Sequence, residues 1–474
     1  MSKITFQTST PEKQGIPATA IGEFIERLSA FDFVQSFMLL RHDALVAECC
    51  WAPYQPEYRH ELFSISKSFV SIAVGLAQDE GRLCLSDKLV DYFPEKMTPE
   101  VSSRMKSVTL RNLLTMSSGH KRCILMDLLP LKDWVKAFLE SRLDYSPGTT
   151  FVYNSAATYM LAAVIRKVTG ENVVDYLRPR IFEPLGIVPG KWDCCPMGIN
   201  IGGWGFWLAT KDLLQFGRFL LNRGCWNGRQ LISGDYLREA TSFEIETSQN
   251  SQRDWKLGYG YQFWQTSFNS FRADGACGQY IVVMPDEDIV WAVTAGMSDM
   301  QNILTAFWET IYPSLKGSPL PEDSGAVCAL KKRIAACRLM PLSNSLNQIP
   351  DSCKYELSRN KLGLRYLEFH FTDRNCSCVF FRDNGEQETM TANYNSHCRN
   401  FLKLNENEIR VLEASAAWQD ESELLIQVYA AETPYRDCYH IQFAQDQVHM
   451  RRTSNLTFLH NEWESLMGRK VAMP

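Results

Sequence analysis

Up to about residue 313, stretches with apolar residues at helical spacing alternate with shorter stretches of strand character. Residues 21–28 repeat apolar side chains at helical spacing, which predicts an amphipathic helix. Apolar runs on both sides of His42-Asp43 predict a hairpin of two strands, and so do the runs within 280–296. This mixture of helices and strand hairpins indicates an α+β fold class for the first part of the chain.

The pattern changes near residue 314. Residues 314–350 are rich in proline, serine and asparagine around a short helical patch near 330–339, which is typical of a linker. Beyond it, strand-like runs alternate apolar with polar residues and are separated by turn residues. We therefore predict an α+β domain over 1–313, a linker with a short helix over 314–350 and a small antiparallel all-β domain over 351–474.

Composition agrees with two globular domains. The 474 residues exceed one ordinary domain, and the 45% hydrophobic and 22% charged residues are typical of folded chains. The net charge of -5 is too small to favour a nucleic-acid surface, which requires clustered Lys and Arg. We therefore expect no nucleic-acid partner, and the sequence leaves the oligomeric state open.

The sequence gives no sign of export or of metal binding. The first 28 residues lack the apolar segment of a secretory signal, and no later run has the length of a membrane span. We therefore expect a cytoplasmic protein with no membrane association. The fifteen cysteines are odd in number and irregularly spaced, so we expect reduced interior thiols. Since CxxC, HxxxH and HExxH patterns are absent, no metal site and no cofactor are expected.

A serine and a lysine stand three residues apart at the start of an apolar run. They are Ser64 and Lys67 in residues 61–77, ELFSISKSFVSIAVGLA. On a helix this spacing places both side chains on one face, and the apolar surroundings predict a buried helix. Burial and a position near the helix start both lower the pKa of a lysine. A neutral Lys67 would accept the hydroxyl proton of Ser64, which predicts an activated serine nucleophile.

The Ser-x-x-Lys pattern alone is weak evidence. The same pattern occurs at Ser103-Lys106, Ser118-Lys121 and Ser358-Lys361, in each case within a polar stretch. Only Ser64 opens an apolar segment of helical length, and this context favours it as the nucleophile. The backbone N–H of a serine at a helix start is also free to bind an oxyanion.

Tyr153 is the predicted third member of the site. It stands at the end of an extended segment that follows Pro147-Gly148, just before a helix expected to begin near Ser155 with Asn154 or Ser155 as its N-cap. A phenol at the end of a loop can reach into a cleft and relay a proton between nucleophile, lysine and leaving group. The alternative is that Tyr153 is packed, half-buried, without a role.

Several segments carry a family resemblance in the same chain order. Besides the motif at Ser64 they are TLRNLLTMSSGH (109–120), SPGTTFVYNSAATYMLAAVI (146–165) and GGWGFWLATKDLLQFGRFLLNRGCWNGRQLIS (202–233). Over roughly residues 10–312 the chain resembles the serine hydrolases that include class C β-lactamases, DD-peptidases and related esterases. The resemblance implies an antiparallel sheet flanked by helices plus an all-helical subdomain, with Ser64, Lys67 and Tyr153 acting through an acyl-enzyme.

The chain departs from the family at the residues expected to bind substrate. Ser155 replaces the usual Asn of the second motif, so a hydroxyl would contact the substrate. In the third motif, usually Lys, His or Trp, then a small residue, then Gly, the best match is Ala273-Asp274-Gly275. Without a cation there, we expect Asp274 to repel the carboxylate of β-lactams and peptides. Gly275 and the N–H of Ala276 are further candidates for binding substrate, and the following Cys-Gly-Gln favours the esterase and short-amide side of the family.

Three functions remain open at this stage. The leading hypothesis is a serine hydrolase acting through an acyl-enzyme on a small-molecule ester or amide. The second is a β-lactamase or penicillin-binding DD-peptidase, which a cytoplasmic location and the missing cation disfavour. The third is a non-catalytic ligand-binding protein that keeps the fold, since fold alone does not fix function.

Overall fold

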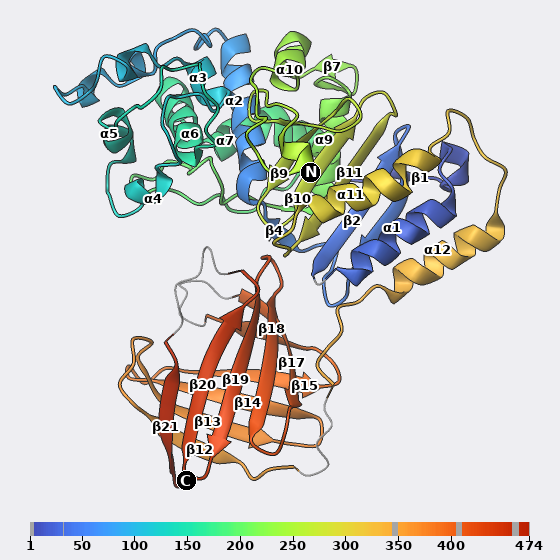
Figure 1. Cartoon of the computed structure of the whole chain (residues 1–474), viewed down its shortest axis with the longest axis vertical. Coiled ribbons are helices and arrows are strands. Elements are labelled where there is room, and N and C mark those ends of the chain that lie inside the picture. The colour runs from blue at the N-terminus through green and yellow to red at the C-terminus, as the bar shows by residue number, and fades with distance from the viewer. Residues whose placement is uncertain (1–3, 32, 344–348, 404–409, 457–463, 474) are drawn as a thin grey trace. The chain divides into compact units, whose positions relative to one another are not determined.

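The computed structural model describes residues 4–31, 33–343, 349–403, 410–456 and 464–473. These residues form two compact units (Figure 1). The first comprises Met1–Cys49, Arg59–Ala295 and Asp299–Ala336, and the second comprises Cys50–Tyr58, Gly296–Ser298 and Cys337–Pro474. The domain boundaries at 313 and 351 stay predictions.

A mixed sheet organises the first unit. Among the described residues its strand order is β1 (Gln7–Thr8), β3 (Ala44–Cys50), β2 (Val34–Arg41), β11 (Ile289–Ala295), β10 (Gln279–Met284), β9 (Ser270–Gly275) and β8 (Trp264–Thr266). Only β1 and β3 pair in parallel. The β2–β3 hairpin turns at His42 and Asp43, both at positive φ. Both hairpins expected from the hydrophobic pattern are confirmed.

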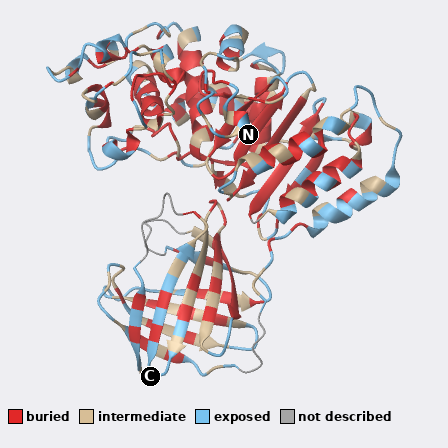
Figure 2. Ribbon diagram, in the orientation of Figure 1, coloured by how far each residue is buried: buried red, intermediate tan, exposed pale blue. Residues whose placement is uncertain are grey.

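Helices cover both faces of this sheet, which explains why its inner strands are apolar without alternation. On one face α9 (Thr210–Leu221) approaches so closely that a side chain at Gly217 would lie 2.4 Å from Val290. On the other, Phe307 of α11 (Gln301–Thr310) stacks on Trp291 at 4.6 Å. Phe24 of α1 (Ala18–Ala30) contacts both rings. The sheet is therefore buried throughout its centre (Figure 2).

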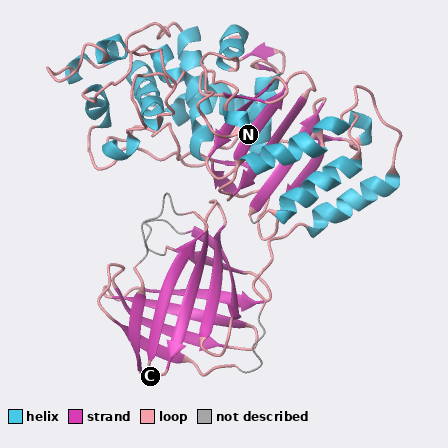
Figure 3. Ribbon diagram, in the orientation of Figure 1, coloured by secondary structure: helices cyan, strands magenta, loops and turns pink. Residues whose placement is uncertain are grey.

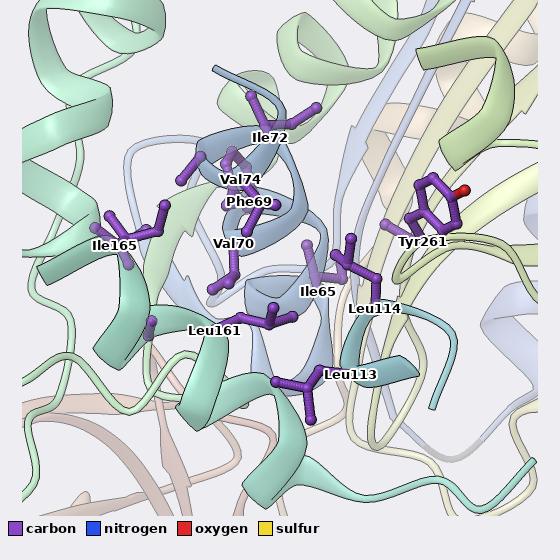
Figure 4. Packing of buried hydrophobic residues seen from close by; sticks show 14 of the residues in the cluster. Ile65, Phe69, Val70, Ile72, Val74, Leu113, Leu114, Leu161, Ile165 and Tyr261 are labelled. Carbon is purple, nitrogen blue, oxygen red and sulfur yellow. The ribbon is translucent and has the colours of Figure 1, made fainter. Parts of the chain in front are cut away.

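A helical part surrounds the segment that carries the predicted nucleophile. Helix α2 (Ser66–Asp79) is buried from Ser66 to Ala77 and follows a short 3₁₀ turn, Phe63–Ile65. Figure 4 shows Ile65, Phe69 and Val70 packed among residues of α3 (Leu110–Leu114) and α6 (Ser155–Thr169). The remaining elements of the unit are β4 (Arg59–Glu61), α4 (Leu125–Leu128), α5 (Trp134–Leu139), α7 (Val173–Leu177), α8 (Glu183–Leu185), β5 (Trp207–Ala209), β6 (Cys225–Trp226), β7 (Arg229–Gln230), α10 (Gly234–Ala240) and α12 (Ser324–Ala336).

Helix α12 differs from the patch expected near 330–339. It begins at Ser324, where the Asp323 side chain accepts a 2.8 Å bond from the N–H of Ala326, and it ends at Ala336. Residues 337–339 are instead extended, because the N–H of Leu339 donates to the carbonyl of Ala52. A capping carboxylate and a distant backbone partner thus set the two ends of the helix.

The second unit is a sheet that closes on itself (Figure 3). Its neighbours are antiparallel, and a short parallel pairing of β15 with β17 joins the two ends. Buried apolar residues alternate with more exposed ones along β13, β14 and β20, as expected for strands with one face inside. The strands are β12 (Cys353–Leu357), β13 (Leu364–Phe371), β14 (Asn375–Arg382), β15 (Gln387–Tyr394), β16 (Cys398–Leu402), β17 (Arg410–Trp418), β18 (Glu423–Ala430), β19 (Arg436–Ala444), β20 (Gln447–Ser454) and β21 (Leu466–Val471). The predicted fold class, α+β followed by all-β, is confirmed.

Two general expectations can be compared with the described residues. Cys84, Cys194 and Cys328 are exposed, so the expectation of interior thiols is wrong for these three. In the parts of the chain that the structure describes, no helix combines the length and apolar character needed to cross a membrane.

Candidate active site

Ser64 lies in a tight turn between a strand and a buried helix. Strand β4 pairs with β5, and the N–H of Leu62 then donates a 2.9 Å bond to the carbonyl of Phe206. The chain reverses at Phe63, whose φ of 47° is unfavourable for a bulky aromatic side chain. Strain of this kind persists only where the surroundings fix it. The surroundings here hold Ser64 partly accessible at the start of α2.

Lys67 is buried beside Ser64, only 1% exposed. Its Nζ lies 2.8 Å from Ser64 Oγ and 2.6 Å from the carbonyl oxygen of Gly203. Burial lowers the pKa of Lys67 to about 7, although the charge of Asp274 and the nearby Cys123 act to raise it. A large share of Lys67 is therefore neutral near pH 7, as a base for Ser64 requires.

Burial separates this Ser-x-x-Lys pair from the other three copies of the pattern. Lys106, Lys121 and Lys361 are all exposed. None of them shares the burial that distinguishes Lys67. The apolar context that favoured Lys67 in the sequence thus corresponds to a real difference in environment.

Tyr153 lies at the entrance of α6, next to the same pair. Asn154 caps the helix through its side-chain oxygen, which accepts a 3.1 Å bond from the N–H of Ala156. Lys67 Nζ lies 4.9 Å from the centroid of the Tyr153 ring, and the Tyr153 hydroxyl interacts with the Ser64 side chain. Burial, and then the charge of Asp274, raise the pKa of Tyr153 far above its usual value. The phenol therefore stays protonated, able to donate a proton but not to act as the base.

The third motif occupies the end of strand β9, directly beside the turn that holds Ser64. A side chain at Gly275 would lie 2.1 Å from the carbonyl oxygen of Leu62, so only glycine permits this approach. The following turn is tied down by Gln279, whose side chain donates to the carbonyls of Ala276 at 3.2 Å and Ala295 at 2.6 Å. Ala276 is thus presented by an ordered turn one residue beyond the contact with Leu62.

The carboxylate of Asp274 in the third motif has a cationic partner. Asp274 is buried and paired with Arg272, the nearest N–O distance being 3.1 Å. Burial raises the pKa of Asp274, whereas Arg272 acts to lower it. Arg272, two residues earlier on the same strand, therefore pairs with the charge of Asp274, and the expected repulsion of a substrate carboxylate stays a prediction. The predicted role of Asp274 in binding substrate also stays a prediction.

Ser155, the other predicted contact, lies beside the segment that binds Lys67. A side chain at Gly203 would meet the β-carbon and carbonyl oxygen of Ser155, both at 3.0 Å. Ser155 is partly exposed at the first position of α6. The predicted Ser64, Lys67, Tyr153 and Ser155 therefore gather around one point, with Gly203 among them.

Sequence reasoning missed three residues of this site. Gly203 gives no signal, since its contribution is a backbone carbonyl oxygen. Trp264 of β8 stacks on Tyr153 with ring centroids 5.6 Å apart, and Arg272 pairs with Asp274. The spacing of Arg272 and Asp274 along an alternating strand indicates a shared face and was the one available clue.

The family model described as Beta-lactamase matches residues 36–299, more than half of the chain. The chain belongs to the beta-lactamase family. Its catalytic candidates all lie within the matched range. Family membership supports hydrolytic acyl transfer from a serine, while the type of substrate is left undetermined.

Individual relatives are distant. Penicillin-binding protein 4 of Amycolatopsis lactamdurans is 23% identical over 299 residues, 55% of this chain and 77% of that protein. The 6-aminohexanoate-dimer hydrolase of Paenarthrobacter ureafaciens is 24% identical over 269 residues, 52% of this chain and 68% of that protein. A solved family VIII carboxylesterase shares the fold with a TM-score of 0.51 and 17% identity, covering 66% of this chain and all of that chain (100%).

Proposed function

We propose that this protein is a serine hydrolase that cleaves a small, uncharged ester or amide through an acyl-enzyme. The observation that carries the proposal is the 2.8 Å contact between Ser64 Oγ and the buried Nζ of Lys67. Burial supplies the neutral amine that the chemistry needs, and no metal or cofactor is invoked.

The proposed reaction begins with proton transfer from Ser64 to neutral Lys67. Ser64 Oγ then attacks the substrate carbonyl carbon, and the carbonyl electrons move onto oxygen. The N–H groups of Ser64 and Ala276 are the proposed donors to this oxyanion. As the carbonyl re-forms and the bond to the leaving group breaks, Tyr153 donates its proton to the leaving alcohol or amine and takes in exchange the proton held by Lys67. Water attacks the acyl-enzyme in the same way and releases the acid, with Ser64 regaining its proton.

The charge around the site supports an uncharged acyl group. Arg272, the cation nearest the third motif, is fully buried and already bound to Asp274. Its Nη1 also donates to the carbonyls of Asp254 and Gln265, both at 2.9 Å. Because it is fully buried, it is not presented on the surface to a substrate carboxylate. Aromatic side chains at Tyr153 and Trp264 instead favour apolar groups.

A fluorophosphonate probe with peptide mass spectrometry tests the nucleophile. We expect label on Ser64 and loss of ester turnover in Ser64→Ala, whereas Ser103→Ala, the serine of an exposed Ser-x-x-Lys copy, should keep full activity. Absence of label on Ser64, or undiminished ester turnover in Ser64→Ala, would contradict the proposal. Lys67→Ala should lose most activity while remaining folded.

A panel of esters, D-amino-acid amides and lactams distinguishes the two competing functions from the proposed one. The relative named penicillin-binding protein 4 favours testing labelled penicillin directly. Acylation of Ser64 by penicillin, with slow ester turnover, would favour a β-lactamase or DD-peptidase. Thermal stabilisation by a ligand without turnover of any ester, D-amino-acid amide or lactam would favour a non-catalytic binding protein. A cytoplasmic location is part of our proposal, and cell fractionation with an antibody against the protein checks it.

A further inference from the structure

The inference concerns Trp264 and rests on the proposed function. Trp264 begins β8, is 5% exposed and stands opposite Arg272 of β9 in the strand register. Its ring lies nearly parallel to that of Tyr153, with an interplanar angle of 23°. Tyr259 meets both rings edge-on, at 4.8 Å from Trp264 and 6.2 Å from Tyr153. Tyr153 is therefore packed against a rigid aromatic cluster.

Trp264 is itself fixed by a buried ion pair. The guanidinium of Arg272 lies 5.6 Å from the Trp264 ring and 4.4 Å from that of Trp255. Arg272 Nε donates a 3.1 Å bond to the carboxylate of Asp274, and the Trp264 side chain also hydrogen-bonds that carboxylate. An ion pair within β9 that packs against two aromatic rings has little freedom to rearrange.

The backbone bonds near Tyr153 do not by themselves orient its ring. Residues 151–153 belong to no strand. Their backbone is held by a 2.8 Å bond from the N–H of Val152 to the carbonyl of Met116 and by the Gln249 side chain, which donates to the carbonyl of Phe151 at 3.2 Å. A tyrosine that relays a proton must keep its hydroxyl within hydrogen-bond reach of Ser64 and of the leaving group. Misplacement of a reacting group by about 1 Å can cost a hundredfold in rate. The hydrogen bonds of residues 151–153 hold the backbone, whereas the orientation of the ring depends on its packing against Trp264 and Tyr259.

We propose that Trp264 is a positioning residue that fixes the Tyr153 ring for proton transfer, and that the Arg272–Asp274 pair holds Trp264 in place. The third motif thereby supports Tyr153 through Asp274. Trp264 does not touch the reacting atoms in this scheme and acts only through Tyr153.

A double-mutant cycle tests this dependence. We expect Tyr153→Phe to lower kcat by about a hundredfold and Trp264→Leu by roughly tenfold, with little change in KM. In the Tyr153→Phe background, Trp264→Leu should change kcat by less than about twofold. Trp264→Phe keeps a ring that can stack and should recover most of kcat. The control Trp226→Leu, in the hairpin of β6 and β7, should leave kcat unchanged.

Two results would overturn the inference. One is an equal loss of kcat from Trp264→Leu in both backgrounds, which indicates a general structural effect. The other is a change in KM alone, which indicates a pocket wall. If Trp264→Leu does not fold, Asp274→Asn replaces it in the cycle under the same criterion, with kcat compared at pH 9, above the pKa of Lys67 of about 7.

A second readout separates this inference from the proposed function. Fluorine NMR of 3-fluorotyrosine protein, with the Tyr153 signal assigned by Tyr153→Phe, reports the mobility of the ring without any substrate. Faster ring motion in Trp264→Leu with no ester turnover in the wild type would retain the positioning role and refute the hydrolase. Turnover that depends on Ser64, together with unchanged ring motion and multiplicative losses, would refute the positioning role alone.

Discussion

Lys67 Nζ donates a 2.6 Å hydrogen bond to the carbonyl oxygen of Gly203. A neutral amine has two N–H groups and one lone pair, so this bond leaves the lone pair available for the Ser64 proton. Gly203 precedes β5, which pairs with the strand leading into Ser64. The acceptor that orients the base and the turn that presents the nucleophile therefore both adjoin one small two-stranded sheet.

Activity should depend on the proton of Lys67. Because burial lowers its pKa to about 7, kcat/KM should fall about tenfold per pH unit below that value, where the base is protonated. Asp274 acts to raise this pKa, so Asp274→Asn should shift the acid limb to lower pH. A pH–rate profile from pH 5 to 9 checks both. A flat profile down to pH 5 would contradict the role of Lys67 as base.

The free energy of unfolding should also depend on the protonation of Lys67. Above the folded-state pKa of about 7 and below the unfolded value near 10.4, the unfolded chain binds a proton that folded Lys67 does not. Lys67 therefore destabilises the folded state most below pH 7, and this penalty fades as the pH rises. The free energy of unfolding of the wild type, relative to Lys67→Met, should rise by about 1.4 kcal/mol per pH unit between 7 and 10. Urea denaturation of both proteins at several pH values measures this difference. The same pH dependence of the free energy of unfolding in the wild type and in Lys67→Met would refute the prediction.

Gly203→Ala should impair catalysis more than folding. The added β-carbon would lie 3.0 Å from two atoms of Ser155, so the backbone must shift by a few tenths of an ångström. The carbonyl that orients Lys67 shifts with it, and we expect kcat to fall roughly tenfold with a small change in KM. Steady-state kinetics and a thermal melt check this. Unchanged kcat would show that the carbonyl of Gly203 is not needed to orient the base.

Gly275→Ala should be the more damaging glycine substitution. Its β-carbon would lie 2.1 Å from the carbonyl oxygen of Leu62, so β9 and the Ser64 turn must separate. We expect a loss of about 1–3 kcal/mol in stability and more than a hundredfold in kcat/KM. The control is Gly22→Ala in α1, where no atom lies within 4 Å of the new β-carbon. That variant should be neutral or slightly more stable; comparable losses in both would refute the claim.

Local signals explain what could be predicted from the sequence. The His42-Asp43 turn, the Asn154 cap and the apolar run after Ser64 each act within a few residues, and each was found correctly. The buried environment of Lys67 followed from the same local pattern.

Long-range pairing explains what the sequence did not reveal. Trp264 and Tyr153 stand more than a hundred residues apart and meet only because β8 is paired to β9. The pairing of Asp274 depends on strand geometry, since Arg272 reaches it only when residues 272 and 274 share a face. The Gly203 carbonyl could not be found at all, because a backbone atom leaves no mark on composition or spacing.

The second unit is assembled from separate parts of the chain, which has a consequence for biosynthesis. Residues 50–58 belong to this unit, and the Ala52 backbone bonds both Cys337 and Leu339. These partners leave the ribosome almost three hundred residues later. The backbone of Ala52 must therefore wait through most of translation for these two partners. Ending translation before residue 337 would remove both bonds from Ala52, on the chain that leads directly to Ser64.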